Sequence, residues 1–228
     1  MNSGDLYDRF RNEVVDEDKP YLWTPTNVWD YMNDAYVMFA RLTDGIADIT
    51  TSEVVEVPIS LGQKRVDLHP KILRFMSAYK LSTGADIPVI NGPDIPALLK
   101  DTQYLNLPRL LNSDQQGDVR YLVVGQQKDV GTLILTPAVD DTLMLSVYRL
   151  PLNPVIDETH PLDEIDDIHH LHLLDWMKHL AYKKQDAETL DRRASDDGRA
   201  NFEAYCAKVK AEQQRYKHKT RSVAYGGL

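Results

Sequence analysis

The sequence predicts an α+β fold: a helical bundle formed by N- and C-terminal helices, an inserted antiparallel β-rich module and an extended C-terminal tail. Three observations support this prediction: apolar residues recur at helical spacing near both ends, they alternate in the middle, and the last residues are polar and glycine-rich. The predicted segments are residues 1–50 for the first part of the bundle, 51–155 for the inserted module, 156–216 for the second part of the bundle and 217–228 for the tail.

Two helices are expected before residue 50. Ser3 can cap the first, and its apolar residues recur every four positions: Leu6, Phe10 and Val14. In the second, Thr24 is a suitable N-cap, Pro25 suits the first helical position, and the helix ends near Gly45. Its apolar stripe consists of Val28, Met32, Ala35, Tyr36 and Phe39.

The middle of the chain changes to strand periodicity. In "SEVVEVPIS" (52–60), Val55, Val57 and Ile59 share one face, and Pro58 favours an edge strand. Three later segments, "RYLVVG", "GTLILTP" and "TLMLSVYRL", are separated by the turn-forming "QQKD" and "AVDD", so they predict an antiparallel meander. Its core-facing residues are Leu143, Leu145 and Val147. Between these parts, residues 69–115 stay unassigned. The stretch "LHPKILRFMSAYKL" (68–81) is ambiguous between helix and strand, and 87–108 offers mostly loop.

Helical periodicity returns at residues 160–186, "HPLDEIDDIHHLHLLDWMKHLAYKKQD", where Pro161 suits the first turn and acids follow it. A last helix is expected from about Ala187 past Tyr216, with an apolar stripe of Phe202, Tyr205, Cys206 and Val209. Gly198 should weaken this helix by about 1 kcal/mol relative to alanine. The ending "KTRSVAYGGL" predicts a flexible tail that orders on a surface.

Composition limits the classes of protein. The 228 residues are 43% hydrophobic and 27% charged, which is ordinary for a soluble globular protein. The start carries Asp5 and Asp8 where a signal peptide would be basic and then apolar, and no stretch approaches the roughly 18 apolar residues of a membrane span. One cysteine, Cys206, excludes disulfides within a subunit. We therefore expect a non-secreted protein of a reducing compartment, with no membrane partner.

Charge is distributed unevenly along the chain. The net charge is −9, but the stretch from Lys208 to Arg221 has six basic residues and one acid, Glu212, and so carries +5 against −14 elsewhere. Such a basic end suits an anionic or carbonyl-rich partner, although lysines near a helix C-terminus also favour the helix dipole and the solvent.

Four of the seven histidines lie in "HHLHLLDWMKH" (169–179). On a helix, His172, Asp175 and His179 fall within about 60° of one another, so a shared metal ion is one hypothesis. The segment lacks the glutamate that follows the first histidine of a metalloprotease helix. The alternative is a packing helix, with one face on its own core and the histidines and Asp175 hydrogen-bonded against a neighbouring subunit. We expect no metal or other cofactor.

Other catalytic motifs are missing from the sequence. It has no Gly-x-Ser-x-Gly elbow and no phosphate-binding loop. The acids Asp163, Glu164, Asp166 and Asp167 suit a solvated first helical turn, and Trp23, Trp29 and Trp176 suit core positions. The prediction is that the protein is not an enzyme.

Two stretches carry a resemblance to a family. The opening "PYLWTPTNVWDYMNDAYVMFARLTDGI" and the closing "LLDWMKHLAYKKQDAETLDRR" through "AEQQRYKHKTRSVAYGG" resemble the head-to-tail adaptor, or connector, proteins of tailed bacteriophages. The resemblance implies a virion structural protein assembled in the host cytoplasm. Its copies would form a ring, expected to be a dodecamer, below the portal protein ring, with tail or nozzle proteins on the far side and duplex DNA passing through the channel without specific binding.

In that family the C-terminal segment docks on the portal. Carried onto this sequence, the role falls on Lys217, Lys219, Arg221, Tyr225, Gly226, Gly227 and Leu228. Ordering such a tail costs about 1–2 kcal/mol per residue in backbone entropy, so charged and aromatic contacts would have to compensate, and adding the tail to a portal sheet is one possible mode.

Alternatives and further contacts remain open from the sequence. The basic tail could instead bind nucleic acid or an acidic protein outside a virion, and a metal-dependent enzyme would use His172, Asp175 and His179. Within the inserted module, the loops "QQKD" (126–129) and "NSDQQGD" (112–118) are candidates for contacting tail components or neighbouring subunits. An acidic channel lining would let DNA slide.

Overall fold

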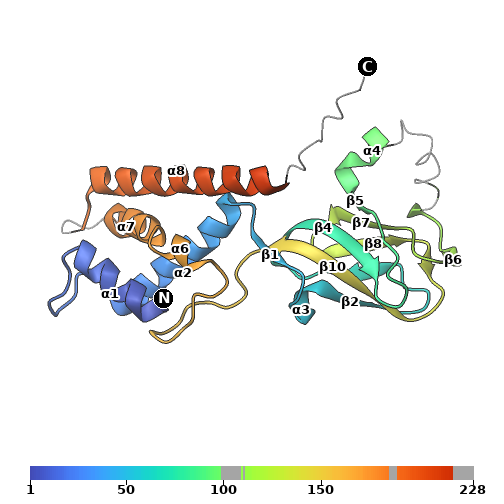
Figure 1. Ribbon diagram of the computed structural model, residues 1–228, viewed down its shortest axis with the longest axis horizontal. Helices are drawn as coiled ribbons and strands as arrows, with labels where there is room; N and C mark the ends of the chain where they lie inside the picture. Colours follow the sequence, from blue (N-terminus) through green and yellow to red (C-terminus); the bar gives the residue numbers. More distant parts are fainter. Residues whose placement is uncertain (99–108, 110, 185–188, 218–228) are drawn as a thin grey trace, which may run out of the picture. The chain divides into compact units, whose positions relative to one another are not determined.

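The computed structural model describes residues 1–98, 109, 111–184 and 189–217, and it confirms the α+β class. The chain divides into two compact units (Figure 1). The helical unit comprises Met1–Asp44 and Pro151–Leu228, and the β unit comprises Gly45–Leu150. Each unit is described by itself below.

The helical unit contains α1 (Ser3–Glu13), α2 (Pro25–Leu42), α6 (Asp167–His170), α7 (Leu173–Lys183) and α8 (Arg192–Lys217). Its first N-cap is Asn2, one residue before the predicted Ser3. The Asn2 side chain accepts a hydrogen bond from the Asp5 amide at 2.8 Å, and the Asp5 carboxylate accepts one from the Asn2 amide at 3.0 Å. Ser3 is instead buried, and its hydroxyl donates to the Asp157 carbonyl at 2.6 Å.

Helix α2 is confirmed as predicted. The Thr24 hydroxyl accepts a hydrogen bond from the Asn27 amide at 3.3 Å, and Pro25 occupies the first helical position. The whole predicted apolar stripe is buried. After the C-cap Thr43, Asp44 and Gly45 have φ values of 72° and 96°, so a left-handed turn ends the helix where glycine was expected to end it.

The prediction of one helix starting at Pro161 is wrong. Pro161 forms an isolated β-bridge with Asn2, and the carboxylate of Glu164 accepts hydrogen bonds from the Leu152 and Asn153 amides at 3.1 and 3.3 Å. These contacts fix the stretch before Asp167 as a loop. Helical structure begins at α6 and, after a break, continues in α7.

Helices α7 and α8 pack closely (Figure 1). Phe202, Cys206 and Val209 of the predicted stripe are buried, and Tyr205 is half-buried. Gly198 has a packing role that the sequence did not reveal. A Cβ at this position would lie 2.6 Å from the Asp175 carbonyl oxygen and 3.2 Å from the His179 amide nitrogen, so the two helix backbones nearly touch there.

The first sheet of the β unit is built around one long strand. Strand β10 (Asp141–Arg149) lies at its centre, with β4 (Ile72–Lys80) on one edge and two shorter strands on the other. These are β1 (Ile46–Asp48) and β2 (Glu56–Ile59), and all pairings are antiparallel. Pro58 therefore lies in an edge strand, as expected, although the strand starts at Glu56 because α3 (Ser52–Val55) forms a helical turn before it.

The second sheet has the order β3 (Arg65–Asp67), β8 (Val130–Ile134), β7 (Tyr121–Gln127) and β5 (Val89–Asn91). Strand β5 is parallel to β7, and the other pairs are antiparallel. Further elements of the β unit are η1 (Gly92–Asp94), α4 (Ile95–Leu98) and a small parallel pair of β6 (Gln116–Gly117) and β9 (Thr136–Pro137).

The predicted three-stranded meander is only partly correct. Strands β7 and β8 form an antiparallel hairpin, but β10 belongs to the other sheet. The chain leaves β8 at Leu135, whose φ is 62°, and pairs with β6 before it reaches β10. Leu143, Leu145 and Val147 are buried as predicted. The ambiguous segment near residue 75 is strand β4.

Candidate interaction surfaces

The predicted docking tail lies almost wholly outside the residues that the structure describes. Lys217 is the last residue of α8, and its side chain is not among those described. The other six candidate docking residues lie outside the described part: Lys219, Arg221, Tyr225, Gly226, Gly227 and Leu228. Portal docking by this tail therefore stays a proposal.

The candidate metal residues are engaged with other groups. The His172 ring stacks on the Tyr205 ring, with centroids 3.4 Å apart, and an Asp175 oxygen lies 3.3 Å from the Lys178 ammonium nitrogen. His179 Nδ1 lies 3.0 Å from the Ser195 carbonyl oxygen, so this nitrogen carries the proton and donates. The expectation that these histidines face a neighbouring subunit is wrong, because His172 and His179 pack on α8 of the same chain.

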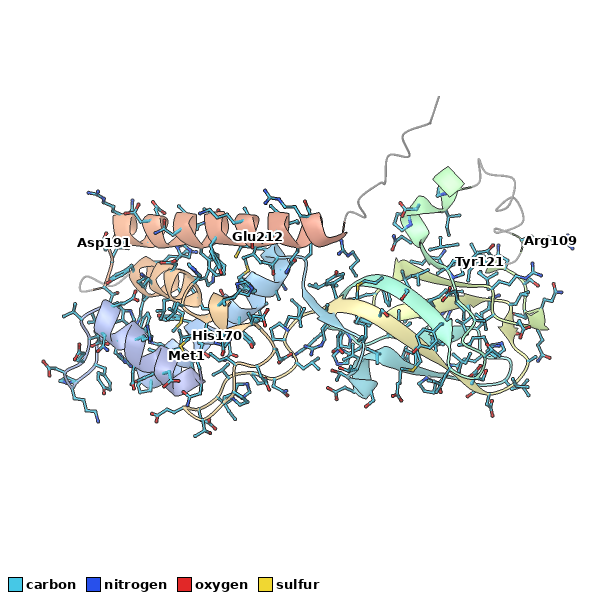
Figure 2. The ribbon with its side chains drawn as sticks, in the orientation of Figure 1. Met1, Arg109, Tyr121, His170, Asp191 and Glu212 are labelled. Atoms are coloured by element: carbon cyan, nitrogen blue, oxygen red, sulfur yellow. The ribbon has the colours of Figure 1, made fainter. Side chains whose placement is uncertain are left out.

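The other two histidines of the segment also make internal contacts. His169 Nδ1 lies 2.7 Å from the Tyr205 hydroxyl, and burial lowers the pKa of His169. His170 Nε2 donates to the Ile165 carbonyl at 2.8 Å. Met1 and His170, neighbours in Figure 2, share Asp167, which lies 3.2 Å from the terminal amine and 3.3 Å from the His170 ring. Among the described residues, no group of three or more His, Cys, Asp or Glu side chains could hold a metal ion.

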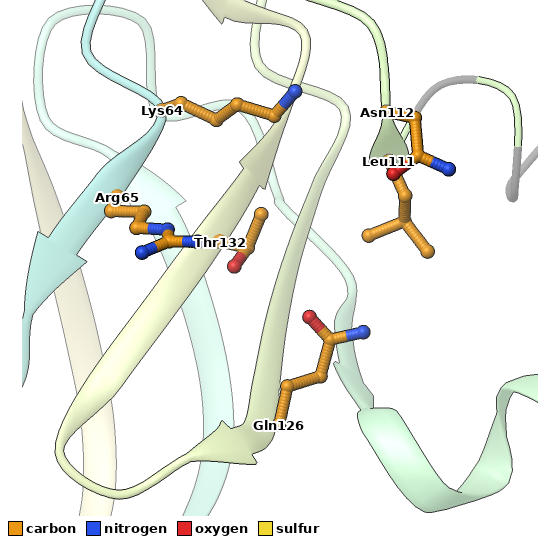
Figure 3. A pocket seen from close by; sticks show the side chains of 6 residues that line it. All are labelled: Lys64, Arg65, Leu111, Asn112, Gln126 and Thr132. Atoms are coloured by element: carbon orange, nitrogen blue, oxygen red, sulfur yellow. The ribbon is translucent and has the colours of Figure 1, made fainter.

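A polar hollow of about 500 Å³ lies in the β unit (Figure 3). It is lined by Lys64, Arg65, Leu111, Asn112, Gln126 and Thr132. The Lys64 ammonium donates to the Ser113 carbonyl at 2.7 Å and lies 3.0 Å from an Asp114 oxygen, which anchors the loop opposite β3. Both candidate contact loops reach this hollow. Two cations and two amides suit an anionic or amide-bearing group, but the described lining contains no nucleophile with an adjacent base.

An apolar groove of about 130 Å³ lies between β4 and the turn that joins β7 to β8. Its walls include Ile72 and Phe75 from β4 and Val124 and Val130 from the hairpin. Lys128 of the "QQKD" loop also lines it. The sequence does not reveal this groove, because residues 68–81 are ambiguous between helix and strand and the two walls are about 50 positions apart.

None of the helices within the described part of the chain is long and apolar enough to span a membrane. The described surface carries a polar hollow, an apolar groove and a long, highly charged helix. Such features, on a two-unit α+β fold, are compatible with a structural protein that binds other macromolecules.

Comparison with known families shows which family the chain belongs to. A family model described as SU10 adaptor protein matches residues 1–224, so the chain belongs to the SU10 adaptor protein family. This match confirms the resemblance to phage head-to-tail adaptors and spans both units. No curated protein matches the chain.

Proposed function

We propose that this phage adaptor forms a ring, of twelve copies, on the portal protein at the capsid vertex. The ring joins the capsid to tail or nozzle proteins and continues the DNA channel, and its subunits assemble into virions in the host cytoplasm. The family match over residues 1–224 is the observation that supports this proposal, because an adaptor must contact both the head and the tail.

Portal docking is assigned to the tail that follows α8. Basic residues gather at the C-terminal end of this helix, where cations interact favourably with the helix dipole. One of them is already committed within the helical unit, since the Lys210 ammonium lies 2.7 Å from an Asp44 oxygen. Lys219, Arg221 and Tyr225 would supply charged and aromatic contacts to the portal, and Gly226 and Gly227 would allow close backbone approach.

Electrostatics also suit a DNA channel. The chain outside residues 208–221 carries a net charge of −14, and Lys and Arg contacts to phosphates drive nonspecific DNA binding. An acidic ring therefore lets duplex DNA pass without holding it. The alternative nucleic-acid-binding function predicts the opposite, a DNA affinity that falls steeply with salt. A fluorescence-anisotropy titration of duplex DNA at two salt concentrations distinguishes the two functions.

Mass photometry of the portal ring mixed with the adaptor tests docking. We expect many copies per ring with the intact chain and none with a chain that ends at Tyr216. The double variant Lys219→Ala/Arg221→Ala should bind weakly. Its matched control is Arg192→Ala/Arg193→Ala, which removes the same charge from exposed positions at the other end of α8 and should bind normally. Equal binding by the truncated chain would contradict tail docking, and no binding by the intact chain would contradict the adaptor assignment on this portal.

A further inference from the structure

We propose that the polar hollow of the β unit binds an acidic side chain of a partner protein, with Arg65 as the residue that holds its carboxylate. Asp114 acts as an internal carboxylate that competes with the partner for Lys64. This inference goes beyond the proposed ring, because it assigns a ligand class to a site of the single chain. Figure 3 shows Arg65 beside Thr132, with Leu111 across the hollow from them.

The hollow lies where the apolar cover of the second sheet ends. Arg65 of β3, Thr132 of β8 and Val123 of β7 are in register and share one face of this sheet. Val123 belongs to a buried apolar cluster that includes Ile95 of α4. Toward β3 the face becomes polar, since Thr132 is half-buried and Arg65 is exposed. Within the described part of the chain, this side of the face is therefore accessible to a partner.

Every polar side chain that lines the hollow can donate a hydrogen bond. These groups are an ammonium, a guanidinium, a hydroxyl and two amides, and the described lining contains no carboxylate. The Arg65 side chain makes no ion pair or hydrogen bond with the rest of the described chain. Because a guanidinium binds a carboxylate through two parallel hydrogen bonds, an uncommitted arginine beside further donors selects a carboxylate as the ligand.

Lys64 shows that this site already accepts a carboxylate. Its ammonium donates to the Ser113 carbonyl at 2.7 Å and lies 3.0 Å from an Asp114 oxygen. The Asp114 side chain is 89% exposed, so this ion pair contributes little to stability, and a carboxylate from a partner can replace it. The contact with Ser113 would still hold the loop, so the exchange requires no refolding.

Leu111 gives the hollow an apolar wall. This side chain is half-buried and packs against the apolar cluster of the second sheet. The methylene groups of a glutamate can contact Leu111 while its carboxylate binds Arg65, and apolar surroundings strengthen such an ion pair. The volume of about 500 Å³ lies within the range of about 300–1,000 Å³ typical of ligand sites, so it can accept a short acidic segment.

Neighbouring acids disfavour a nucleic acid as the ligand. Asp114 and Asp118 are both highly exposed on the loop that adjoins the hollow. Duplex DNA carries one charge per about 1.7 Å of its axis, so its backbone would pass these acids as well as the two cations. A short acidic segment needs only the two cations. The arrangement of charge therefore favours a protein carboxylate over DNA phosphates.

Fluorescence anisotropy of a labelled hexaglutamate peptide, titrated with the intact chain at low salt, tests the site. We expect binding, and Arg65→Gln should weaken it about three- to fivefold, as for a single exposed ion pair. The matched control is Arg120→Gln, which removes the same charge from an exposed position of the β unit that does not line the hollow. It should bind the peptide as the wild type does. Both positions are exposed, so neither change should affect folding.

Asp114→Asn provides a second test with the opposite sign. It should tighten peptide binding more than Asp118→Asn does, because both remove one negative charge from the same loop but only Asp114 competes for Lys64. No binding by the wild-type chain, equal affinities of Arg65→Gln and Arg120→Gln, or equal effects of the two aspartate variants would overturn the proposal. Arg65-dependent binding of a short DNA duplex, tighter than that of the peptide, would overturn the choice of a protein ligand. These measurements use the free chain, so their failure is distinguishable from a failure to load the portal.

Discussion

Gly198→Ala should destabilise the helical unit, although helix propensity alone predicts a gain of about 1 kcal/mol. The added Cβ would lie 2.6 Å from the Asp175 carbonyl oxygen and 3.2 Å from the His179 amide nitrogen. Both are backbone atoms, so no flexible side chain can move aside. Helices α7 and α8 must separate by several tenths of an ångström, and this loosens the packing of Trp176 on Phe202, whose ring centroids are 5.2 Å apart.

The magnitude follows from two opposing contributions. Overpacking a close contact costs about 1–3 kcal/mol, which exceeds the propensity gain of about 1 kcal/mol. We therefore expect the free energy of unfolding to fall by about 1 kcal/mol for alanine and further for valine. Guanidinium denaturation, monitored by tryptophan fluorescence, measures this free energy of unfolding. Asn201→Ala, exposed on the same helix, is the control and should change stability by about 0.5 kcal/mol or less. Stabilisation by Gly198→Ala would refute the close approach of the two helices.

Three other predictions concern buried charge and metal. Asp16→Ala leaves the Arg11 guanidinium buried without its carboxylate partner. The free energy of unfolding, measured by thermal melting, should therefore fall by about 3–5 kcal/mol. A decrease of less than about 1 kcal/mol would contradict the pairing. Burial raises the pKa of Asp48, but hydrogen bonds from Arg149 and from backbone amides outweigh it and hold the pKa well below its ordinary value. Because a depressed pKa stabilises the folded state above about pH 4 and the effect is lost as pH falls further, Asp48→Asn should flatten the acid limb of a pH–stability profile. A chelator should change neither melting nor portal loading, and stoichiometric zinc or iron in purified protein would contradict this.

Local signals in the sequence were sufficient to predict helix α2. Thr24, Pro25 and a complete apolar stripe act within one helix, and all of them are used as expected. The start of α6 could not be predicted from local sequence, because contacts with residues farther away in the chain determine it. Glu164 binds backbone amides twelve residues earlier, and this contact holds as a loop a stretch whose composition resembles a first helical turn. The sheet assignment of β10 failed for a similar reason, since its partners β1, β2 and β4 all lie earlier in the chain, before the long segment 81–140.

For the candidate site residues, too, the sequence predicted local features but not the contacts between distant segments. Periodicity placed His172 and His179 on one helical face, but it could not show that α8 covers that face and supplies Tyr205 and Ser195. Gly198 seemed a weakness of α8 because its neighbour across the helix interface was unknown.

Folding and assembly depend on separate residues in this chain. The contacts that fix the helical unit are internal, as at Gly198 and Asp16, whereas the proposed docking residues Lys219 and Arg221 follow its last helix, α8. Lys219→Ala/Arg221→Ala should therefore leave the unfolding transition in place while it reduces the number of copies on the portal ring, and Gly198→Ala should do the reverse at temperatures below its melting point. If the double variant lowered the melting temperature as much as Gly198→Ala does, these two side chains would belong to the fold and the proposed docking role would lose its basis.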